Sequence, residues 1–423
     1  MIEGIKLNQP IRSFLVKALI IALCFGVVSL LSNKEFIRDN VGDAGFDITN
    51  ALFSFVESPK KKTIPNVIIF AIDDLYMKNR SLLDGNEDTN YGYRFSRQYI
   101  ADFLNTLDLT LKKENITIQS LFINYDFSFT LSSDGKLLTD GDKALINELK
   151  KPRPYSIFLP KTQINNFIET YSDNTIQQLI NNERIRFVSV GLLKNNDNSV
   201  RRYLGFKKLE NKNYNNIAVE LWQESGGNNN IKEDDIIANR ILIKSDKHHP
   251  SKENCETKYN NWDGYSLHSA DCLTINDFNF EKLDNAILML GSTYKKNGDK
   301  HNIFMNRNLN GIEMHANTLM TLFYLNGQVK KINWWINMII TFIITFFVDI
   351  VAWILLPSTI KNGTLLHGLI TTLSTLGIMI ILSFILLMTY GYWFNWYVPI
   401  GLYLLYEIYE FIIKLTIRRK KCT

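Results

Sequence analysis

Residues 67–74 read Val67-Ile68-Ile69-Phe70-Ala71-Ile72-Asp73-Asp74, a continuous apolar run that ends in two aspartates. A short apolar run that is rich in β-branched residues is typical of a strand that is buried on both faces. Such strands belong to parallel sheets whose two faces are covered by helices. The run therefore predicts an α/β domain built around residues 67–72.

The segments that follow this run alternate between helical and extended patterns. Residues 95–113 carry Tyr99, Phe103, Leu107 and Leu111 at helical spacing and predict a helix. The other expected segments are strands at 120–126, 155–159, 202–207 and 286–291, helices at 142–150 and 312–324, and further elements at 217–224 and 240–243. Because strands separated by helices need crossover connections, the alternation predicts a largely parallel sheet.

Long apolar stretches at 14–31, 334–356, 365–388 and 396–413 predict four transmembrane α-helices, since a bilayer core of roughly 30 Å needs about 20 apolar residues. Lys17 interrupts the first stretch, which is either a retained anchor or a cleaved signal peptide; the lack of a small-residue cleavage site favours the anchor. The expected parts are an N-terminal transmembrane anchor at 1–33, a soluble domain at 34–332, three transmembrane helices at 333–415 and a basic tail at 416–423.

Flanking charge predicts the orientation of these helices. The loop at 357–364 contains Lys361 and no acid, the loop at 389–395 is uncharged, and Arg418-Arg419-Lys420-Lys421 follows the last stretch. Since basic residues stay on the cytoplasmic side, both chain ends are expected in the cytoplasm and residues 34–332 outside it. The net charge of +5 lies largely in this tail, so it does not indicate a nucleic-acid partner.

Polar residues at and beside the expected strand ends form a first candidate site. Asp73, Asp74 and Asp126 lie at strand ends, Arg94 and Arg97 open the adjacent helix, and Tyr294, Asp299 and His315 add hydrogen-bonding groups. Ligands of open parallel sheets bind beyond the carboxyl ends of the strands, which points to a pocket for a small ligand or a cation. Caps and ion pairs that lock the fold explain the same residues, and this structural interpretation is favoured because such pairs are common at strand ends. A metal ligand role for His315 is not expected, because no spacing in the chain has zinc-site quality.

Motifs of catalysis and cofactor binding are missing from the sequence. It contains no nucleophile elbow, no phosphate-binding glycine loop, no kinase signature set and no HExxH. The chain is therefore not expected to be an enzyme or to hold a cofactor.

Two cysteines of the expected exported part, Cys255 and Cys272, lie about 17 residues apart. An oxidising compartment favours a disulfide between them, and closing a loop of this length contributes roughly 3 kcal/mol by restricting the unfolded chain. Two free thiols are the alternative.

Charged residues inside the apolar stretches form a second candidate site. Asp349 lies within 334–356, where a buried carboxylate costs at least ~2.5 kcal/mol unless it is paired or hydrated. Lys17, His367 and Glu407 lie at a similar depth in the other stretches. One interpretation is an ion-pair network, centred on Lys17 and Asp349, that fixes the helix packing and docks a partner. The other is that Asp349 faces a wet cleft and that Glu407 belongs to a helix already leaving the bilayer.

Four parts of the sequence resemble the CHASE2 domain, an extracytoplasmic sensory module of bacterial receptors. They are 67–74, 92–107, 199–203, and 286–293 with 311–318. The last, Gly-Ile-Glu-Met-His-Ala-Asn-Thr, is the most specific. The resemblance implies an α/β CHASE2-like domain in the periplasm, held by transmembrane helices in the bacterial inner membrane. Arg94-Phe95-Ser96 departs from the family's Pro-Trp-Pro-like stretch, so no role of those aromatics is carried over.

The resemblance predicts a sensor. Family members usually continue into a kinase, a cyclase or another output domain, whereas this chain ends within about ten residues of its last expected helix. The expected function is extracytoplasmic sensing without an output domain, with membrane lipid, an unknown small ligand and a signalling partner or a second copy as partners. The alternative is an assembly component that uses the domain as a periplasmic docking platform. An enzyme that uses the strand-end carboxylates is a third, less favoured hypothesis.

Overall fold

The computed structural model describes residues 9–30, 43–55, 64–74, 76, 97–125, 140–161, 182–195, 197–209, 212–227, 240–243, 265–274, 278–294, 299–303, 307–356 and 365–422. Arg94, Asp126 and Cys255 lie outside the described residues. The chain divides into two compact units, Met1–Phe55 with Gln328–Thr423, and Val56–Gly327. We call the first the helical unit and the second the α/β unit.

The α/β unit is built on a six-stranded sheet in which every neighbouring pair of strands is parallel. In spatial order the strands are β4 (Ile185–Val188), β3 (Ser156–Pro160), β2 (Ser120–Asn124), β10 (Ile287–Ser292), β1 (Val67–Ile72) and β9 (Ser266–Ser269). All side chains of β1 are buried, because the strand lies inside the sheet between β10 and β9. The predicted α/β class with a parallel sheet is confirmed.

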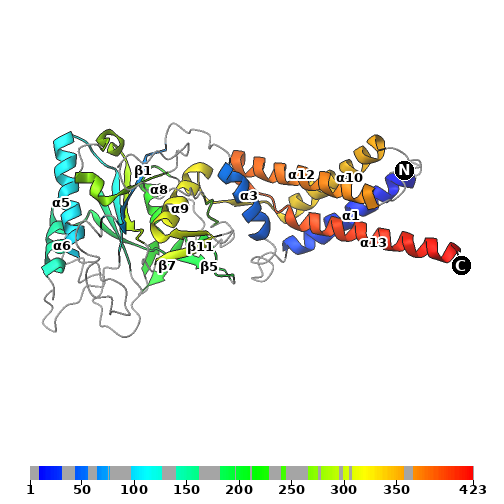
Figure 1. Cartoon of the computed structure of the whole chain (residues 1–423), viewed down its shortest axis with the longest axis horizontal. Helices are drawn as coiled ribbons and strands as arrows, with labels where there is room; N and C mark the ends of the chain where they lie inside the picture. The colour runs from blue at the N-terminus through cyan, green and yellow to red at the C-terminus, as the bar shows by residue number, and fades with distance from the viewer. Residues whose placement is uncertain are drawn as a thin grey trace. The chain divides into compact units, whose positions relative to one another are not determined.

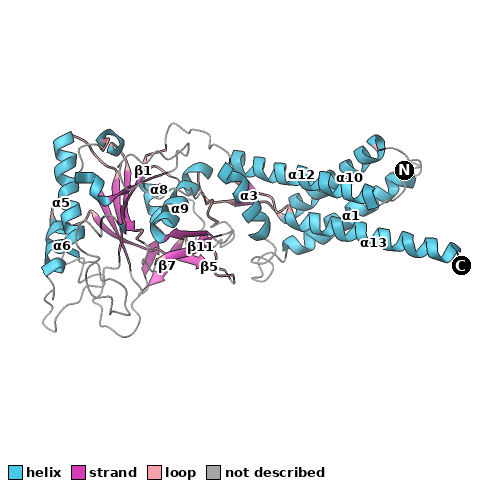
Figure 2. Cartoon of the chain, viewed as in Figure 1, coloured by secondary structure: helices cyan, strands magenta, loops and turns pink. Residues whose placement is uncertain are grey.

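Helices cover both faces of this sheet (Figures 1 and 2). On one face lie α5 (Arg97–Glu114) and α6 (Asp140–Lys150), and on the other α8 (Ile217–Glu224) and α9 (Gly311–Leu325). The arrangement explains why the sheet strands carry apolar residues at consecutive positions, since both faces are removed from water.

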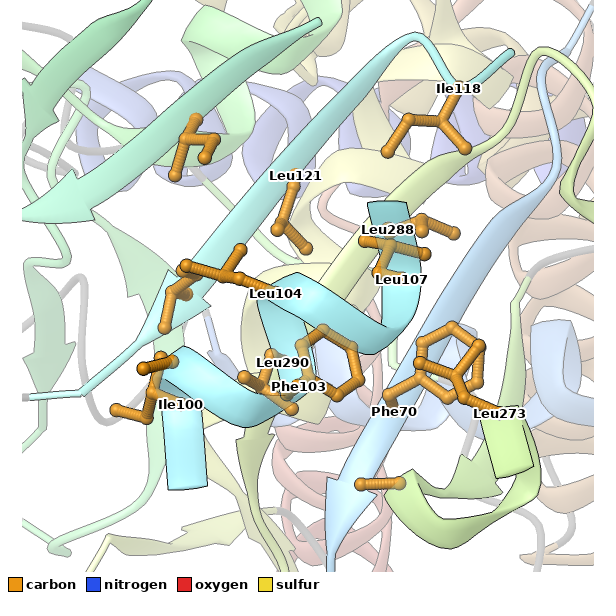
Figure 3. Packing of buried hydrophobic residues seen from close by; sticks show 14 of the residues in the cluster. Phe70, Ile100, Phe103, Leu104, Leu107, Ile118, Leu121, Leu273, Leu288 and Leu290 are labelled. Atoms are coloured by element: carbon orange, nitrogen blue, oxygen red, sulfur yellow. The ribbon is translucent and has the colours of Figure 1, made fainter. Parts of the chain in front are cut away.

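A hydrophobic core fills the space between α5 and the sheet (Figure 3). Phe103, Leu104 and Leu107 of α5 belong to one buried cluster with Leu288 and Leu290 of β10. Burial of each such side chain contributes about 1.5–3 kcal/mol. The helical spacing in residues 95–113 therefore serves to place one apolar face of α5 on the sheet.

Short antiparallel ladders flank the sheet. Among the described residues they are β5 (Leu192–Lys194) with β6 (Val200–Tyr203), β7 (Phe206–Leu209) with β8 (Lys212–Asn215), and β11 (Lys300–Ile303) with β12 (Arg307–Asn310). Two 3₁₀ helices, η3 (Ala270–Thr274) and η4 (Phe280–Leu283), precede β10.

The prediction of a single strand at 202–207 is wrong. The chain turns between β6 and β7, where the Leu204 N–H donates to the Gly191 carbonyl over 3.0 Å. As a result, β6 pairs with β5 and β7 pairs with β8. Residues 240–243 form no strand of their own and contribute an isolated bridge between Arg240 and Arg202.

The helical unit contains α1 (Gln9–Leu30), α3 (Asp43–Phe55), α10 (Trp334–Leu355), α12 (Leu365–Tyr390) and α13 (Tyr397–Cys422). Helix α3 belongs to this unit although it lies within the range 34–332 that was expected for the soluble domain. Two short strands, β13 (Lys330–Lys331) and β14 (Tyr392–Trp393), pair in parallel beside the starts of α10 and α13.

Three of the described helices are long and apolar enough to cross a membrane. They are Ile11–Val28, Trp334–Leu355 and Leu366–Tyr390. By length and composition, three of the four expected membrane helices are therefore found among the described residues. The fourth stretch, 396–413, forms most of α13, but Glu407 and Glu410 interrupt its apolar surface.

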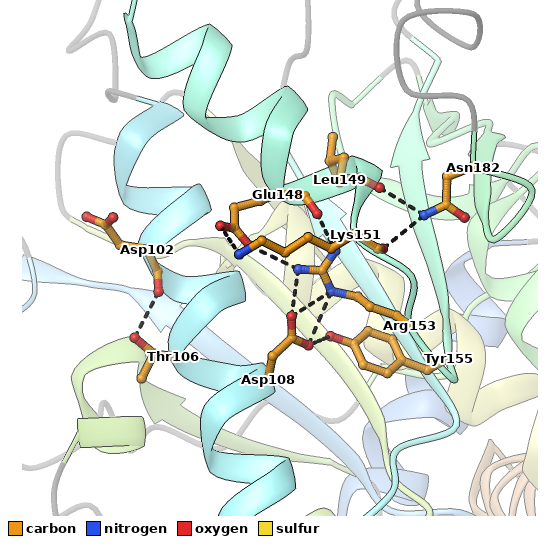
Figure 4. Close-up of polar contacts among 9 residues, drawn as sticks. All are labelled: Asp102, Thr106, Asp108, Glu148, Leu149, Lys151, Arg153, Tyr155 and Asn182. Atoms are coloured by element: carbon orange, nitrogen blue, oxygen red, sulfur yellow. Dashed lines mark hydrogen bonds and ion pairs between the residues drawn. The ribbon is translucent and has the colours of Figure 1, made fainter.

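A buried ion pair joins α5 to the segment between α6 and β3 (Figure 4). The Arg153 Nη2 atom lies 2.7 Å from Asp108 Oδ2 and 3.3 Å from a carboxylate oxygen of Glu148. Tyr155 donates its hydroxyl to Asp108 over 2.7 Å. Burial by itself would lower the pKa of Arg153, but the hydrogen bond and charge of Asp108, with the charge of Glu148, raise it. Asp108 thus compensates a guanidinium group that the core has removed from water.

We predict that Asp108→Ala lowers the free energy of unfolding of the full-length protein by about 3 kcal/mol, because it leaves Arg153 buried without its main partner. Denaturation in mild detergent, followed by circular dichroism, measures the change. Asp140→Ala is the control, since the carboxylate of Asp140 is fully exposed beside Lys143, and it should leave stability nearly unchanged. Equal effects of the two substitutions would contradict the prediction.

Candidate functional site

The first aspartate after β1 caps a turn. Asp73 Oδ1 accepts hydrogen bonds from the Tyr76 N–H over 2.8 Å and from the Ser269 hydroxyl, at the end of β9, over 3.1 Å. Burial raises the pKa of Asp73 above its ordinary value, although these two hydrogen bonds act in the opposite direction. Asp74, the next residue, is exposed. The geometry of Asp73 is that of a cap, the structural role favoured by the sequence.

A second carboxylate lies at the start of α9. The backbone carbonyl of Asp299 accepts the Gly311 N–H over 2.8 Å, and a Cβ atom at position 311 would lie 2.0 Å from Asp299 Oδ2. A larger residue at position 311 would therefore displace the Asp299 carboxylate from this place. The N-terminus of a helix favours negative charge, because its first N–H groups and its dipole point there.

Neighbouring polar groups hold the Asp299 carboxylate in place. Asn124 Nδ2, at the end of β2, donates to Asp299 Oδ2 over 3.2 Å, and His301 Nε2 lies 3.0 Å from Asp299 Oδ1. Burial by itself would raise the pKa of Asp299, but His301, His315 and Asn124 lower it below its ordinary value. Asp299 is consequently ionised at neutral pH.

The same edge of the sheet carries a pair of hydroxyl groups. Ser292, the last residue of β10, donates to the Tyr125 hydroxyl over 2.9 Å. Burial raises the pKa of Tyr125, and the nearby Tyr294, Tyr76 and Asp299 add to this effect. We call Asn124, Tyr125, Ser292, Asp299, His301 and His315 the strand-end cluster.

His315 is the most buried member of the strand-end cluster, at 3% exposure. Its ring stands edge-on to Phe122 of β2, with ring centroids 5.6 Å apart, and its Nδ1 atom has no hydrogen-bond partner among the described residues. Burial lowers the pKa of His315 to about 4, despite the opposing charge of Asp299. The imidazole is therefore neutral at pH 7. No metal-binding group of His, Cys, Asp or Glu occurs in the described part of the chain.

The predicted residues of the first candidate site lie at different places in the structure. Asp299 and His315 lie in one cluster, Asp73 lies at the end of β1 beside Ser269, and Arg97 begins α5. Asp126 is outside the described residues. Sequence reasoning missed Asn124, Tyr125, Ser292 and His301, although the rule that selected Asp126 also applies to the two residues before it. The cluster offers hydrogen-bond donors and acceptors around one carboxylate, which suits the binding of a small polar molecule.

A second polar cluster lies inside the helical unit. Lys17 of α1 places its ammonium group 3.0 Å from Asp349 Oδ1 of α10, and it also forms an ion pair with Glu407 of α13. Tyr403 donates its hydroxyl to the same Asp349 Oδ1, and the Lys17 Nζ atom lies 3.8 Å from the centroid of the Tyr403 ring. We call Lys17, Asp349, Tyr403 and Glu407 the helical charge cluster.

This cluster is removed from solvent. Asp349 is 0% exposed and Lys17 is 4% exposed. The structure thus brings together three of the four residues expected in the network, while His367 is buried on α12 beside Gly368. Tyr403 was not anticipated, because a tyrosine in an apolar helix carries no charge that demands a partner.

Only one of the two cysteines in the predicted disulfide lies among the described residues. Cys272, which is buried in η3, takes part in a disulfide. Its expected partner Cys255 lies outside the described residues, so the pairing stays a prediction. Cys24 in α1 is a free thiol.

Because His315 is buried in the folded protein, we predict that the protein loses stability in acid. Since burial lowers its pKa from 6.5 to about 4, the unfolded chain binds a proton in this window that the folded chain does not. The free energy of unfolding should therefore fall by about 2 kcal/mol from pH 7 to pH 5. In His315→Asn this decrease should be lost, whereas His301→Asn should keep it. Denaturation curves at both pH values measure the effect, and equal acid sensitivity in His315→Asn and wild type would refute it.

Comparison with known protein families matches residues 19–358 to the CHASE2 domain. Comparison with curated proteins and with solved structures gives no match. CHASE2 domains are extracytoplasmic sensory domains, which supports a sensory role in general terms. Because the match covers well over half of the 423 residues, the chain belongs to the CHASE2 family.

Proposed function

We propose that this protein is a membrane-bound sensor of the bacterial inner membrane. The α/β unit detects a small polar ligand in the periplasm, and the helical unit passes the change to a protein partner. Membership of the CHASE2 family supports the sensory role, and the three apolar helices support the membrane location. The observation that carries the proposal is the Asp299 carboxylate at the start of α9, because α9 leads directly into the helical unit.

The proposed topology has four membrane crossings with both chain ends in the cytoplasm. Its fourth crossing is α13, whose Glu407 is compensated by Lys17 and so loses much of the cost of entering a bilayer. Exposed aromatic residues support a membrane surface at one end of these helices, since Trp334 begins α10, Tyr390 ends α12 and Tyr397 begins α13. Aromatic side chains of this kind gather at the membrane surface, while the basic tail after α13 favours the cytoplasm.

Transmission is proposed to run along α9. This helix ends at Asn326, which has a left-handed backbone with φ of 51°, and the chain then enters β13. The Lys330 N–H donates to the Gly391 carbonyl over 2.7 Å, so β13 is bonded to the connection between α12 and α13. A displacement of α9 is therefore expected to move α10 through the covalent connection of β13. It is expected to move α13 through the hydrogen bonds between β13 and β14.

Helix α3 reinforces this connection within the helical unit. Trp396, just before α13, donates its indole N–H to the Thr49 hydroxyl of α3 over 3.0 Å. Phe46 of α3 stands edge-on to Trp393 of β14, with ring centroids 5.7 Å apart. The β13–β14 pair and α3 thus hold the start of α10 close to the start of α13.

Ligand recognition is proposed at the strand-end cluster. The Asp299 side chain is 45% exposed, so a solute can reach it. A small carboxylate or phosphate would compete with Asp299 for the first turn of α9 and for Asn124 and His301. Only a ligand that binds one arrangement of α9 better than the other can shift the equilibrium between them.

A thermal-shift screen of small carboxylates and phosphates on the full-length protein in mild detergent tests ligand binding. A ligand at about 100 times its Kd should stabilise the protein by about 2.7 kcal/mol through mass action. Asn124→Ala should abolish the shift because it removes a donor to the ligand. Asp299→Asn should enlarge the shift because it removes the competing carboxylate, and Asp140→Asn should leave it unchanged. A shift that neither cluster substitution changes would place the ligand elsewhere. Stoichiometric co-purifying proteins without any ligand-induced shift would favour the assembly component.

Reporter fusions test the proposed topology. Alkaline phosphatase, which needs the oxidising periplasm for its disulfides, should be inactive when fused after Thr423 and active when fused after Gln328. Three crossings instead of four would place Thr423 in the periplasm, so an active fusion at Thr423 would contradict the topology. Immunoblots of both fusions control for expression.

A further inference from the structure

The helical charge cluster joins two carboxyl groups to one ammonium group. Lys17 contacts both Asp349 and Glu407. If both acids were ionised, the three side chains would carry a net charge of −1. A net charge is costly at a site that excludes water, because no solvent is present to stabilise it. One bound proton makes the three groups neutral together.

The hydrogen bonds point to the oxygen that holds this proton. Asp349 Oδ1 accepts from both Lys17 and Tyr403. Asp349 Oδ2, by contrast, is buried and has no hydrogen-bond partner among the described residues. An ionised oxygen without a donor is a costly arrangement, whereas a neutral carboxyl group is tolerated far better. We propose that the helical charge cluster is a proton-binding site whose proton resides on Asp349 Oδ2.

Packing ties the site to four helices. Lys17 belongs to α1, Asp349 to α10, and Tyr403 and Glu407 to α13. The Glu407 carboxylate also lies on Gly368 of α12, where a Cβ atom would be only 2.6 Å from Glu407 Oε2. Loss of the proton would leave two adjacent carboxylates with one cation, so protonation favours the closed packing of all four helices.

Other titratable groups belong to the same helices. Tyr406 of α13 is near Asp349, Glu407 and Glu410, and His367 precedes Gly368 on α12. His367 is the group that could carry the compensating charge instead. A proton on His367 would leave both carboxyl groups ionised, and infrared spectroscopy distinguishes the two cases because only a protonated carboxyl group has an acid C=O stretch.

The experiment uses the full-length protein in dodecyl maltoside, a detergent without ester carbonyls, at pH 7. Wild type should show an acid C=O band that shifts in D₂O. The band should be absent from Asp349→Asn and also from Glu407→Gln, since either substitution leaves one carboxylate balanced by Lys17. Asp140→Asn, which removes an exposed carboxyl group of α6, should leave the spectrum unchanged. Size-exclusion chromatography verifies that each near-isosteric variant is folded.

A further variant strengthens the test. Lys17→Met removes the cation, so both acids should be protonated and the band should grow about twofold. Identical spectra for wild type, Asp349→Asn and Glu407→Gln would overturn the proposal. A band that is kept in Asp349→Asn but lost in Glu407→Gln would overturn it as well, because the proton would then reside on Glu407.

Discussion

A buried lysine joins the first described helix of this chain to the last. Lys17 in α1 contacts Asp349 in α10 and Glu407 in α13, residues that are separated from it by most of the sequence. Because a buried charge must be compensated, α1 has to pack against the C-terminal helices. The α/β unit is consequently an insertion between two parts of one helical unit, and its chain enters and leaves that unit at Phe55 and Gln328.

The interior strands of the sheet could be predicted from the sequence, whereas its edge strands could not. Val67–Ile72 and Ile287–Ser292 are central strands, buried along almost their entire length, so their residues are apolar at consecutive positions. The outermost strands, Ile185–Val188 and Ser266–Ser269, were not anticipated. Arg186 is exposed in the first and His268 is polar in the second. An edge strand has one neighbour and less apolar surface to bury, so it leaves a weaker pattern.

Among the site residues, too, some contacts could be predicted from the sequence and others could not. The pairing of Lys17 with Asp349 follows from the cost of an isolated charge in an apolar helix. The contacts of Asp299 follow from no local pattern, because the β11–β12 ladder and the start of α9 together bring it to Gly311. The crossing helix expected at 396–413 illustrates the limit of composition. Its helix exists, but the acid that contacts Lys17 also lowers the hydropathy by which such helices are recognised.

Helix α9 is capped at both ends. At its start, the Glu313 carboxylate accepts the Asn310 N–H over 3.1 Å, and at its end Asn326 closes the last turn. Between these caps, His315 is fixed against Phe122 while Asp299 lies on the first residue. A capped helix with a buried face resists bending, since bending would break its packing and its hydrogen bonds together. In the proposed transmission, a change of charge or contact at Asp299 displaces the whole helix, including the end that leads into β13.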